Sequence, residues 1–193
     1  LGDEAIFAAI DQAAADGASR ISFSGGEPTL HRRLAEFIAR AKGHDIDEIE
    51  LQSNALTLGD RALADRLVDA GMNQAVVSLH AVDPARYLAI TGAGTPDEVI
   101  AGVRNLLDRQ VRVELNVVHN HDNLDHLVAI VDEVAARIPE AEVLFSVTYI
   151  VDGLPRDWDH VAVRYSDAVP HLVAAMRQAR EAGLAHRMTG RCG

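Results

Sequence analysis

Cysteine is almost absent from this sequence: Cys192 is the single cysteine among 193 residues. One thiol cannot form an internal disulfide, and chains without disulfides are typical of a reducing compartment. We therefore expect a cytoplasmic protein. Low-complexity segments are absent too, and no shift in composition marks a boundary between domains.

Positive charge is scarce, with 18 Lys and Arg against 29 Asp and Glu, which gives a formal net charge of −11. This excess of negative charge disfavours nonspecific binding to nucleic acid or to an anionic membrane. The longest apolar runs are far shorter than the ~20 residues that a membrane-spanning helix needs. Neither a membrane nor a nucleic acid is therefore expected as a partner.

A glycine-rich loop at residues 24–30, with the sequence SGGEPTL, follows a short apolar strand predicted at residues 20–23. Gly25 and Gly26 permit positive φ and let the backbone approach a ligand closely. Pro28 favours an extended backbone at Glu27, so the carboxylate extends from a backbone of defined conformation. In α/β folds the carboxyl ends of strands are where ligands usually bind.

Strands and helices alternate along the whole chain. Apolar residues at helical spacing predict helices near residues 3–15, 34–41, 63–70, 95–107, 124–134 and 167–181. Shorter apolar runs predict strands near residues 20–23, 49–54, 75–80, 111–118 and 143–149. Strict alternation with short connections indicates an α/β fold with parallel strands and right-handed crossovers. The residues Thr95-Pro96-Asp97-Glu98 form a capping box at the start of one helix.

The loop at residues 24–30 closely resembles the glycine-glycine-glutamate motif of radical S-adenosylmethionine (SAM) enzymes. Four further strand ends resemble this family in the same order, at residues 52–55 (QSNA), 77–80 (VSLH), 90–95 (ITGAGT) and 117–124 (VVHNHDNL). Ala55 stands where glycine is common in the family, and His80 where an acid is usual. The chain is identified as a member of this family, and it resembles the peptide-maturation and cofactor-biosynthesis branch.

The resemblance implies a partial (β/α)6 TIM-like barrel with parallel strands, of which this chain supplies strands two to six and the first helix. The family's first strand and its CxxxCxxC loop, whose cysteines bind a [4Fe-4S] cluster, are missing, and truncation before Leu1 is the expected reason. Cluster ligation takes several thiolates, so Cys192 cannot replace that loop. We expect residues 1–185 to form the radical SAM core. Residues 186–193 would open a C-terminal extension, in which Cys192 is either a ligand of an auxiliary cluster or an isolated thiol.

The resemblance also implies a reaction for the intact protein. In this family the cluster, reduced by an external one-electron donor, cleaves SAM to methionine and a 5′-deoxyadenosyl radical, which abstracts hydrogen from a substrate. The substrate is expected to be a peptide or a small molecule. Without the cluster loop, the present chain alone is expected to be inactive.

The same resemblance assigns cofactor-binding residues to the loop at residues 24–30 and to the strand end at residues 52–55. Glu27 would accept hydrogen bonds from the ammonium group of SAM, and charge-assisted bonds of this kind are stronger than neutral ones. Gly25 and Gly26 would let the backbone approach the same group. Ser53 and Asn54 are weaker candidates, because an asparagine in a turn often bonds its own backbone.

Ser78, His80 and Asn116 complete the predicted cofactor-binding residues. Ser78 and His80 alternate on one strand, face the same side, and would bond the ribose hydroxyls or the carboxylate of SAM. Asn116 is an amide within an apolar strand, so SAM or a neighbouring backbone group must supply its partners. Each of the three side chains is also compatible with a structural role.

Two alternatives to a radical SAM enzyme come from other functional classes. His80, His119 and His121 could bind zinc or iron for hydrolysis, since imidazoles at a barrel mouth are typical ligands of such metals. The chain could also be a non-catalytic module that binds SAM or a peptide. The loop at residues 151–164 is the best candidate for a lid or partner contact, although its composition favours an ordinary surface loop.

Overall fold

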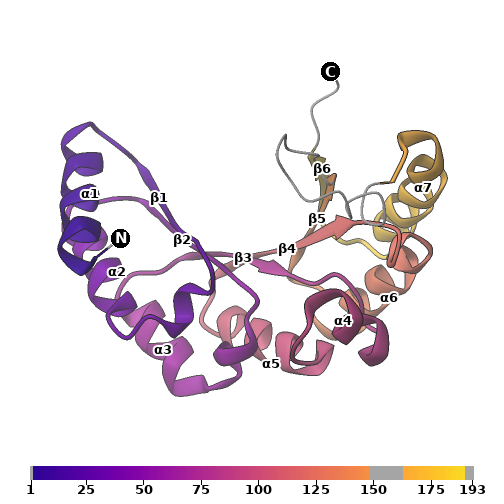
Figure 1. Cartoon of the computed structure of the whole chain (residues 1–193), viewed down its shortest axis with the longest axis horizontal. Helices are drawn as coiled ribbons and strands as arrows, with labels where there is room; N and C mark the ends of the chain where they lie inside the picture. The colour runs from indigo at the N-terminus through magenta and orange to yellow at the C-terminus, as the bar shows by residue number, and fades with distance from the viewer. Residues whose placement is uncertain (1, 148–162, 190–193) are drawn as a thin grey trace. The chain divides into compact units, whose positions relative to one another are not determined.

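The computed structural model describes residues 2–147 and 163–189, which form an α/β fold. Contacts divide the chain into two compact units, one of residues 1–77 and 101–113 and the other of residues 78–100 and 114–193. Figure 1 labels the helices and strands of both units. Cys192 and nearly all of the candidate lid at residues 151–164 lie outside the described residues.

The strands follow the order β1-β2-β3-β4-β5-β6 in the sheet. Their bounds are β1 Arg20–Phe23, β2 Glu48–Ser53, β3 Gln74–Ser78, β4 Arg112–His119, β5 Glu142–Val147 and β6 His186–Thr189. The α-helices are α1 Asp3–Ala15, α2 Leu34–Gly43, α3 Arg61–Asp69, α4 Pro84–Thr91, α5 Pro96–Leu107, α6 Leu127–Arg137 and α7 Tyr165–Glu181. Three 3-10 helices, η1 Pro28–Leu30, η2 Leu56–Gly59 and η3 Leu124–His126, follow β1, β2 and β4.

Every described strand pair with a defined register is parallel. In the first unit β1, β2 and β3 are neighbours, with Ile21 opposite Ile49. In the second unit β4, β5 and β6 are neighbours, with Asn116 opposite Leu144. At least one helix lies between consecutive strands in the sequence, as a parallel arrangement requires. The predicted α/β class with parallel strands is therefore confirmed.

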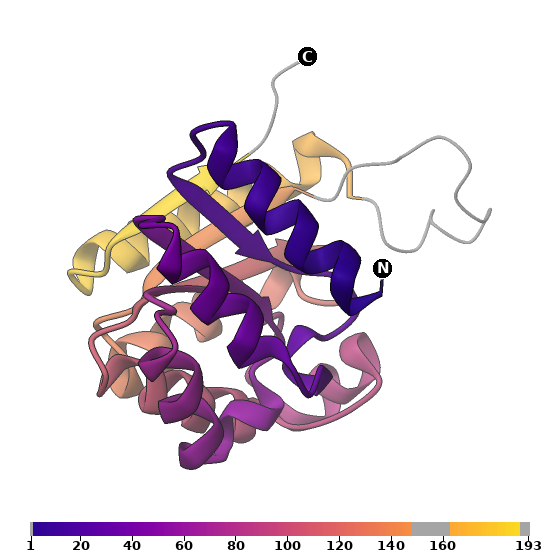
Figure 2. The same cartoon turned by 90° about the vertical axis from the view of Figure 1, so that its left-hand side faces the viewer.

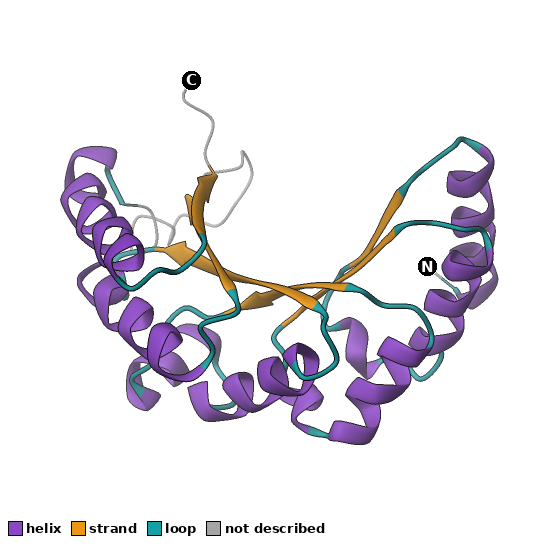
Figure 3. Ribbon diagram, turned by 180° about the vertical axis from the view of Figure 1, so that it is seen from behind, coloured by secondary structure: helices purple, strands orange, loops and turns teal. Residues whose placement is uncertain are grey.

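The two faces of the sheet in the first unit differ in chemistry. Ile49 and Leu51 of β2 are fully buried on the face that the helices cover, where α1 and α2 lie side by side (Figures 2 and 3). On the other face Glu50 is only 3% exposed, because Ser22 donates to it at 2.8 Å, Gln52 donates at 3.2 Å, and Arg20 pairs with it. Burial alone would raise the pKa of the Glu50 carboxyl, but these bonds and the Arg20 charge hold the pKa below its usual value.

One α-helix and one strand were not predicted from the sequence. The helix α4 begins at Pro84, where the side chain of Asp83 accepts from the Arg86 amide at 2.8 Å, and it ends at Gly92 with a φ of 77°. The strand β6 carries the polar sequence HRMT, which lacks apolar alternation, and it forms by pairing with β5. The helix α5, in contrast, starts at the predicted capping box, whose Thr95 hydroxyl accepts from the Glu98 amide at 3.3 Å.

A close contact in the first unit gives a stability prediction. A Cβ placed on Gly102 in α5 would lie 2.4 Å from the carbonyl oxygen of Ala55 and 3.1 Å from the Leu58 Cβ. Ala55 itself has a φ of 59°, so the backbone there has little freedom to retreat. We expect Gly102→Ala to lower the free energy of unfolding by about 2–3 kcal/mol, as overpacking of a core does.

Urea unfolding of this variant beside Gly43→Ala measures the effect. Gly43 ends α2, and a Cβ added there meets no atom within 4 Å, so this control is expected to be neutral or slightly stabilising. Equal stabilities for the two variants would contradict the close packing of Gly102 against Ala55.

Candidate functional site

The loop after β1 has the geometry that the sequence predicts. Gly25 has a φ of 138°, which favours glycine, and a Cβ added to Gly25 or Gly26 would meet no atom within 4 Å. Glu27 is extended, with φ −126° and ψ 107°, as expected before Pro28. The backbone of this loop is therefore open to the approach of a ligand.

The Glu27 carboxylate joins the loop after β1 to the loop after β2. Its Oε1 accepts hydrogen bonds from the Thr29 amide at 3.1 Å, the Thr29 hydroxyl at 2.6 Å and the Ser53 hydroxyl at 2.8 Å. Its Oε2 accepts from the Asn54 amide at 2.8 Å. The structure thus brings together Glu27, Ser53 and Asn54, and it leaves Oε2 with one described donor and room for another.

The polar side chains around Glu27 are largely engaged with the protein itself. The Ser53 hydroxyl, which donates to Glu27, also accepts from the Ala55 amide at 2.9 Å. The Asn54 side chain accepts from the Leu56 amide at 3.0 Å, which is the local bond expected of an asparagine in a turn. Thr57 donates to the Thr29 hydroxyl at 2.6 Å and so extends the chain of hydroxyl groups that ends at Glu27.

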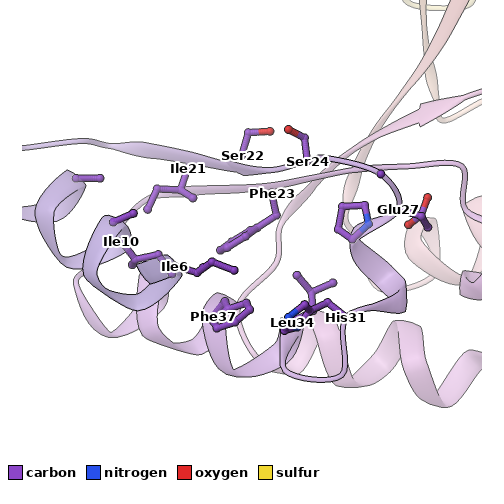
Figure 4. A pocket seen from close by; sticks show the side chains of 14 residues that line it. Ile6, Ile10, Ile21, Ser22, Phe23, Ser24, Glu27, His31, Leu34 and Phe37 are labelled. Atoms are coloured by element: carbon purple, nitrogen blue, oxygen red, sulfur yellow. The ribbon is translucent and has the colours of Figure 1, made fainter. Parts of the chain in front are cut away.

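A cavity of about 490 Å³ lies beside this loop in the first unit. Apolar side chains of α1, β1 and α2 line most of it, and Ser24, Glu27 and His31 add polar groups. Figure 4 shows Ile21 and Phe23 pointing toward the helices, with Ser22 and Ser24 on the opposite side of β1. The volume is that of an ordinary small-molecule site.

In the second unit, the predicted residues Ser78, His80 and Asn116 lie on neighbouring strand segments. The Leu79 amide donates to the Asn116 carbonyl oxygen at 3.2 Å. Because Leu79 and Val117 are fully buried and the three predicted residues are half-buried, the latter face the opposite side. The Oδ1 atom of Asn116 is buried and has no hydrogen-bond partner among the described residues, so this acceptor fits a ligand that brings a donor.

Sequence reasoning missed the structural importance of Asn123, which is 0% exposed. Its Nδ2 donates to the carbonyl oxygens of His80 at 2.9 Å and Val118 at 3.0 Å, and its Oδ1 accepts from the Asn120 amide at 2.8 Å. One amide therefore ties the end of β3 to the end of β4. An asparagine directly before a predicted helix start was the available signal.

The histidines do not form the metal site that the hydrolase alternative requires. The Nδ1 atom of His80 accepts from the Val118 amide at 3.3 Å, His119 is 2% exposed, and His121 is exposed. Within residues 2–147 and 163–189, no group of three His, Cys, Asp or Glu residues could hold a metal ion. The hydrolase alternative is not supported.

Burial lowers the pKa of His80, His119 and His126, and it outweighs the opposing effect of a backbone hydrogen bond at His119. A depressed folded-state pKa stabilises the fold above the unfolded value of ~6.5, and this stability is lost as the pH falls through the folded value. We expect the free energy of unfolding to fall below pH ~6.5, by up to about 1.4 kcal/mol per pH unit for each histidine.

Urea unfolding between pH ~7.5 and ~5.5 measures this slope. Replacing His119 with glutamine should make the slope shallower. A stability that rises as the pH falls would contradict the lowered pKa of these three histidines.

Comparison with known proteins decides the family. Residues 1–134 match the family model described as the radical SAM superfamily. The chain belongs to the radical SAM superfamily. This assignment makes it a domain of the radical SAM enzyme class, whose characteristic cofactors are SAM and an iron–sulfur cluster.

Relatives in sequence and structure agree with this assignment. A protein of Methanocaldococcus jannaschii named "Probable GTP 3',8-cyclase" is 38% identical over 92 residues, which cover 48% of this chain and 30% of that protein. The structure of Streptococcus suis SuiB bound to S-adenosylmethionine superposes with a TM-score of 0.75 and 19% identity, over 96% of this chain and 43% of SuiB. The structure of anSMEcpe with bound AdoMet and Kp18Cys peptide gives a TM-score of 0.73 and 15% identity, over 97% of this chain and 55% of that chain.

The radical SAM fold predicted from the sequence is therefore confirmed, and a non-catalytic module finds no support. The chain spans 30% to 37% of the length of the curated relatives it matches. In the part of the chain that the structure describes, no helix has the length and apolar character needed to cross a membrane.

Proposed function

We propose that this chain binds SAM as part of a radical SAM enzyme, through the residues at the ends of its strands. The observation that carries the proposal is the Glu27 carboxylate, whose Oε2 accepts one described hydrogen bond beside an open glycine backbone. An ammonium group needs such an acceptor, and a charge-assisted bond is the strong form of this contact.

In the first unit, the proposed ligand group is the ammonium of SAM. Glu27 would accept from it through Oε2, and Gly25 and Gly26 would allow the backbone to approach. Ser53 and the Asn54 amide would act through Glu27, because their hydrogen bonds hold its carboxylate in place.

In the second unit, the proposed ligand group is the adenosine of SAM. The buried Asn116 Oδ1 would accept from an amino or hydroxyl donor of the ligand, which relieves the cost of burying an unpaired acceptor. Ser78 and His80 lie on the same face of the sheet and would bond the ribose hydroxyls or the carboxylate.

The [4Fe-4S] cluster does not fit the residues of this chain. Cluster ligation requires several thiolates, and the sequence contains Cys192 alone. When bound in a radical SAM enzyme, the cluster supplies the electron for reductive cleavage of SAM. This chain's own contribution would be to bind, orient and shield the cofactor.

The substrate of the intact protein is proposed to be a peptide or a small molecule, and a nucleoside triphosphate is one candidate because the relatives are named GTP 3',8-cyclases. An external one-electron donor would be its redox partner. We propose a cytoplasmic location, since the single cysteine forms no internal disulfide.

Anaerobic reconstitution of the chain with iron and sulfide tests the proposed binding of SAM and the lack of cluster ligands in this chain. We expect the chain to bind SAM, to show no [4Fe-4S] absorption and to leave SAM uncleaved. Failure to bind SAM would contradict the proposed function. Cleavage of SAM would contradict the conclusion that the residues of this chain do not fit a [4Fe-4S] cluster.

A further inference from the structure

His80 departs from the acid that the family usually carries at this strand end, and the structure shows how the ring is held. The Val118 amide of β4 donates to the His80 Nδ1 atom at 3.3 Å. A backbone N–H can only donate, so Nδ1 carries no proton. A neutral imidazole has one N–H, which therefore resides on Nε2.

The same histidine is also fixed through its backbone. The buried Asn123 amide donates to the His80 carbonyl oxygen at 2.9 Å and to the Val118 carbonyl oxygen at 3.0 Å. The strand β3 ends at Ser78, two residues earlier. Beyond that end, the Leu79 amide donates to the Asn116 carbonyl oxygen at 3.2 Å, and the His80 ring and the Asn123 side chain add further hydrogen bonds that join the chain to β4. The ring is thus held in orientation as well as in tautomer.

The remaining nitrogen of this ring is open to a ligand. No described residue forms a hydrogen bond with His80 Nε2, and this atom is not among the buried polar atoms that lack a partner. His80 is half-buried and shares its face with Ser78, because Leu79 between them is fully buried on the other side. A donor with a fixed direction and no protein partner is suited to recognising an acceptor atom.

We propose that His80 is a neutral hydrogen-bond donor of fixed orientation, whose Nε2–H recognises an acceptor atom of the adenosine in SAM. This inference rests on the proposed function. It makes the side chain at this strand end a hydrogen-bond donor, whereas the carboxylate that the family usually carries there is an acceptor. Burial of the ring lowers the pKa of His80 and so agrees with a neutral imidazole.

The tautomer is tested in the chain without any ligand. Nitrogen-15 NMR is recorded at pH ~7, where an imidazole with a lowered pKa is neutral. We expect His80 to show a protonated Nε2 and an unprotonated Nδ1. The signals are assigned by their loss in His80→Gln. A protonated Nδ1, or a doubly protonated ring, would overturn the inference. This result is independent of whether SAM binds.

Recognition of the ligand is tested by titrating SAM into the wild type and into two variants whose new side chains, glutamine and glutamate, have the same shape as each other. We expect the His80 Nε2–H signal to shift on binding. Glutamine can accept from the Val118 amide and still donate outward, whereas glutamate only accepts. We therefore expect His80→Gln to bind SAM within about threefold of the wild type, and His80→Glu about tenfold more weakly, the loss of one hydrogen bond.

The exposed His121 provides the matched control, since His121→Gln should leave SAM affinity unchanged. Equal affinity of the glutamine and glutamate variants, or an unmoved Nε2–H signal in a wild type that binds SAM, would overturn the donor role and leave the proposed function standing. Absence of SAM binding by the wild type would refute the proposed function and the ligand contact together, while the tautomer is still decided by the ligand-free spectrum.

Discussion

Replacing Glu27 with alanine is expected to weaken SAM binding by about 10- to 100-fold, the loss of one charge-assisted hydrogen bond of about 1.5–3 kcal/mol. The variant should also lose about 2 kcal/mol of stability, because donors on Thr29, Ser53 and Asn54 lose their common acceptor. Calorimetric titration with SAM and urea unfolding measure the two effects.

The control for this variant removes a hydroxyl from the same hydrogen-bonded chain without touching the carboxylate. Thr57 donates to Thr29 at 2.6 Å, one bond away from Glu27. We expect Thr57→Val to lose about 1 kcal/mol of stability and to keep SAM affinity within about threefold. If Thr57→Val weakens SAM binding as much as Glu27→Ala, then Glu27 acts only through the loops that it joins.

Replacing Asn123 with alanine is expected to lower the free energy of unfolding by about 3–4 kcal/mol. The side chain is 0% exposed and satisfies three backbone groups, on His80, Val118 and Asn120. An unsatisfied buried polar group costs about 1–3 kcal/mol, and a cavity adds to the loss. Urea unfolding gives this number.

A second amide in the same unit serves as the comparison. Gln178 of α7 donates to the Asp132 carboxylate at 2.6 Å on the exposed surface. We expect Gln178→Ala to change the stability by no more than about 0.5 kcal/mol, as surface substitutions usually do. A loss at Asn123 as small as the loss at Gln178 would show that Asn123 does not join the two strand ends.

Local features of the fold could be predicted from the sequence because short segments determine them. Short apolar runs, some of them alternating with polar residues, predicted five strands, and the order of elements indicated parallel pairing. The capping box at Thr95 and the extended conformation of Glu27 before Pro28 depend on neighbouring residues alone, and both appear in the structure.

Features that depend on distant residues could not be predicted in this way. The strand β6 has no apolar pattern and forms because its backbone pairs with that of β5. The four hydrogen bonds of Glu27 connect it to residues up to 27 positions away, and those of Asn123 reach His80, 43 positions away. Side chains at such separations meet only when the sheet has formed.

The predicted site residues show the same difference between what the sequence and the fold determine. The resemblance to the family selected Glu27 and His80 at strand ends, and the position of an amide within an apolar strand selected Asn116. Whether each side chain is free for a ligand depends on its partners in the fold. In the structure, three acceptor or donor positions have no described hydrogen-bond partner and are open to a ligand. They are one position on the Glu27 Oε2, the Nε2 atom of His80 and the buried Oδ1 atom of Asn116.

Calorimetric titration of the wild-type chain with SAM and with 5′-methylthioadenosine, which lacks the amino acid part of SAM, is the most direct test. We expect SAM to bind, and the analogue to bind about 10- to 100-fold more weakly, because it cannot reach the Glu27 carboxylate. Equal affinities would show that Glu27 holds no ammonium group, and absence of binding by both compounds would contradict a SAM site in this chain.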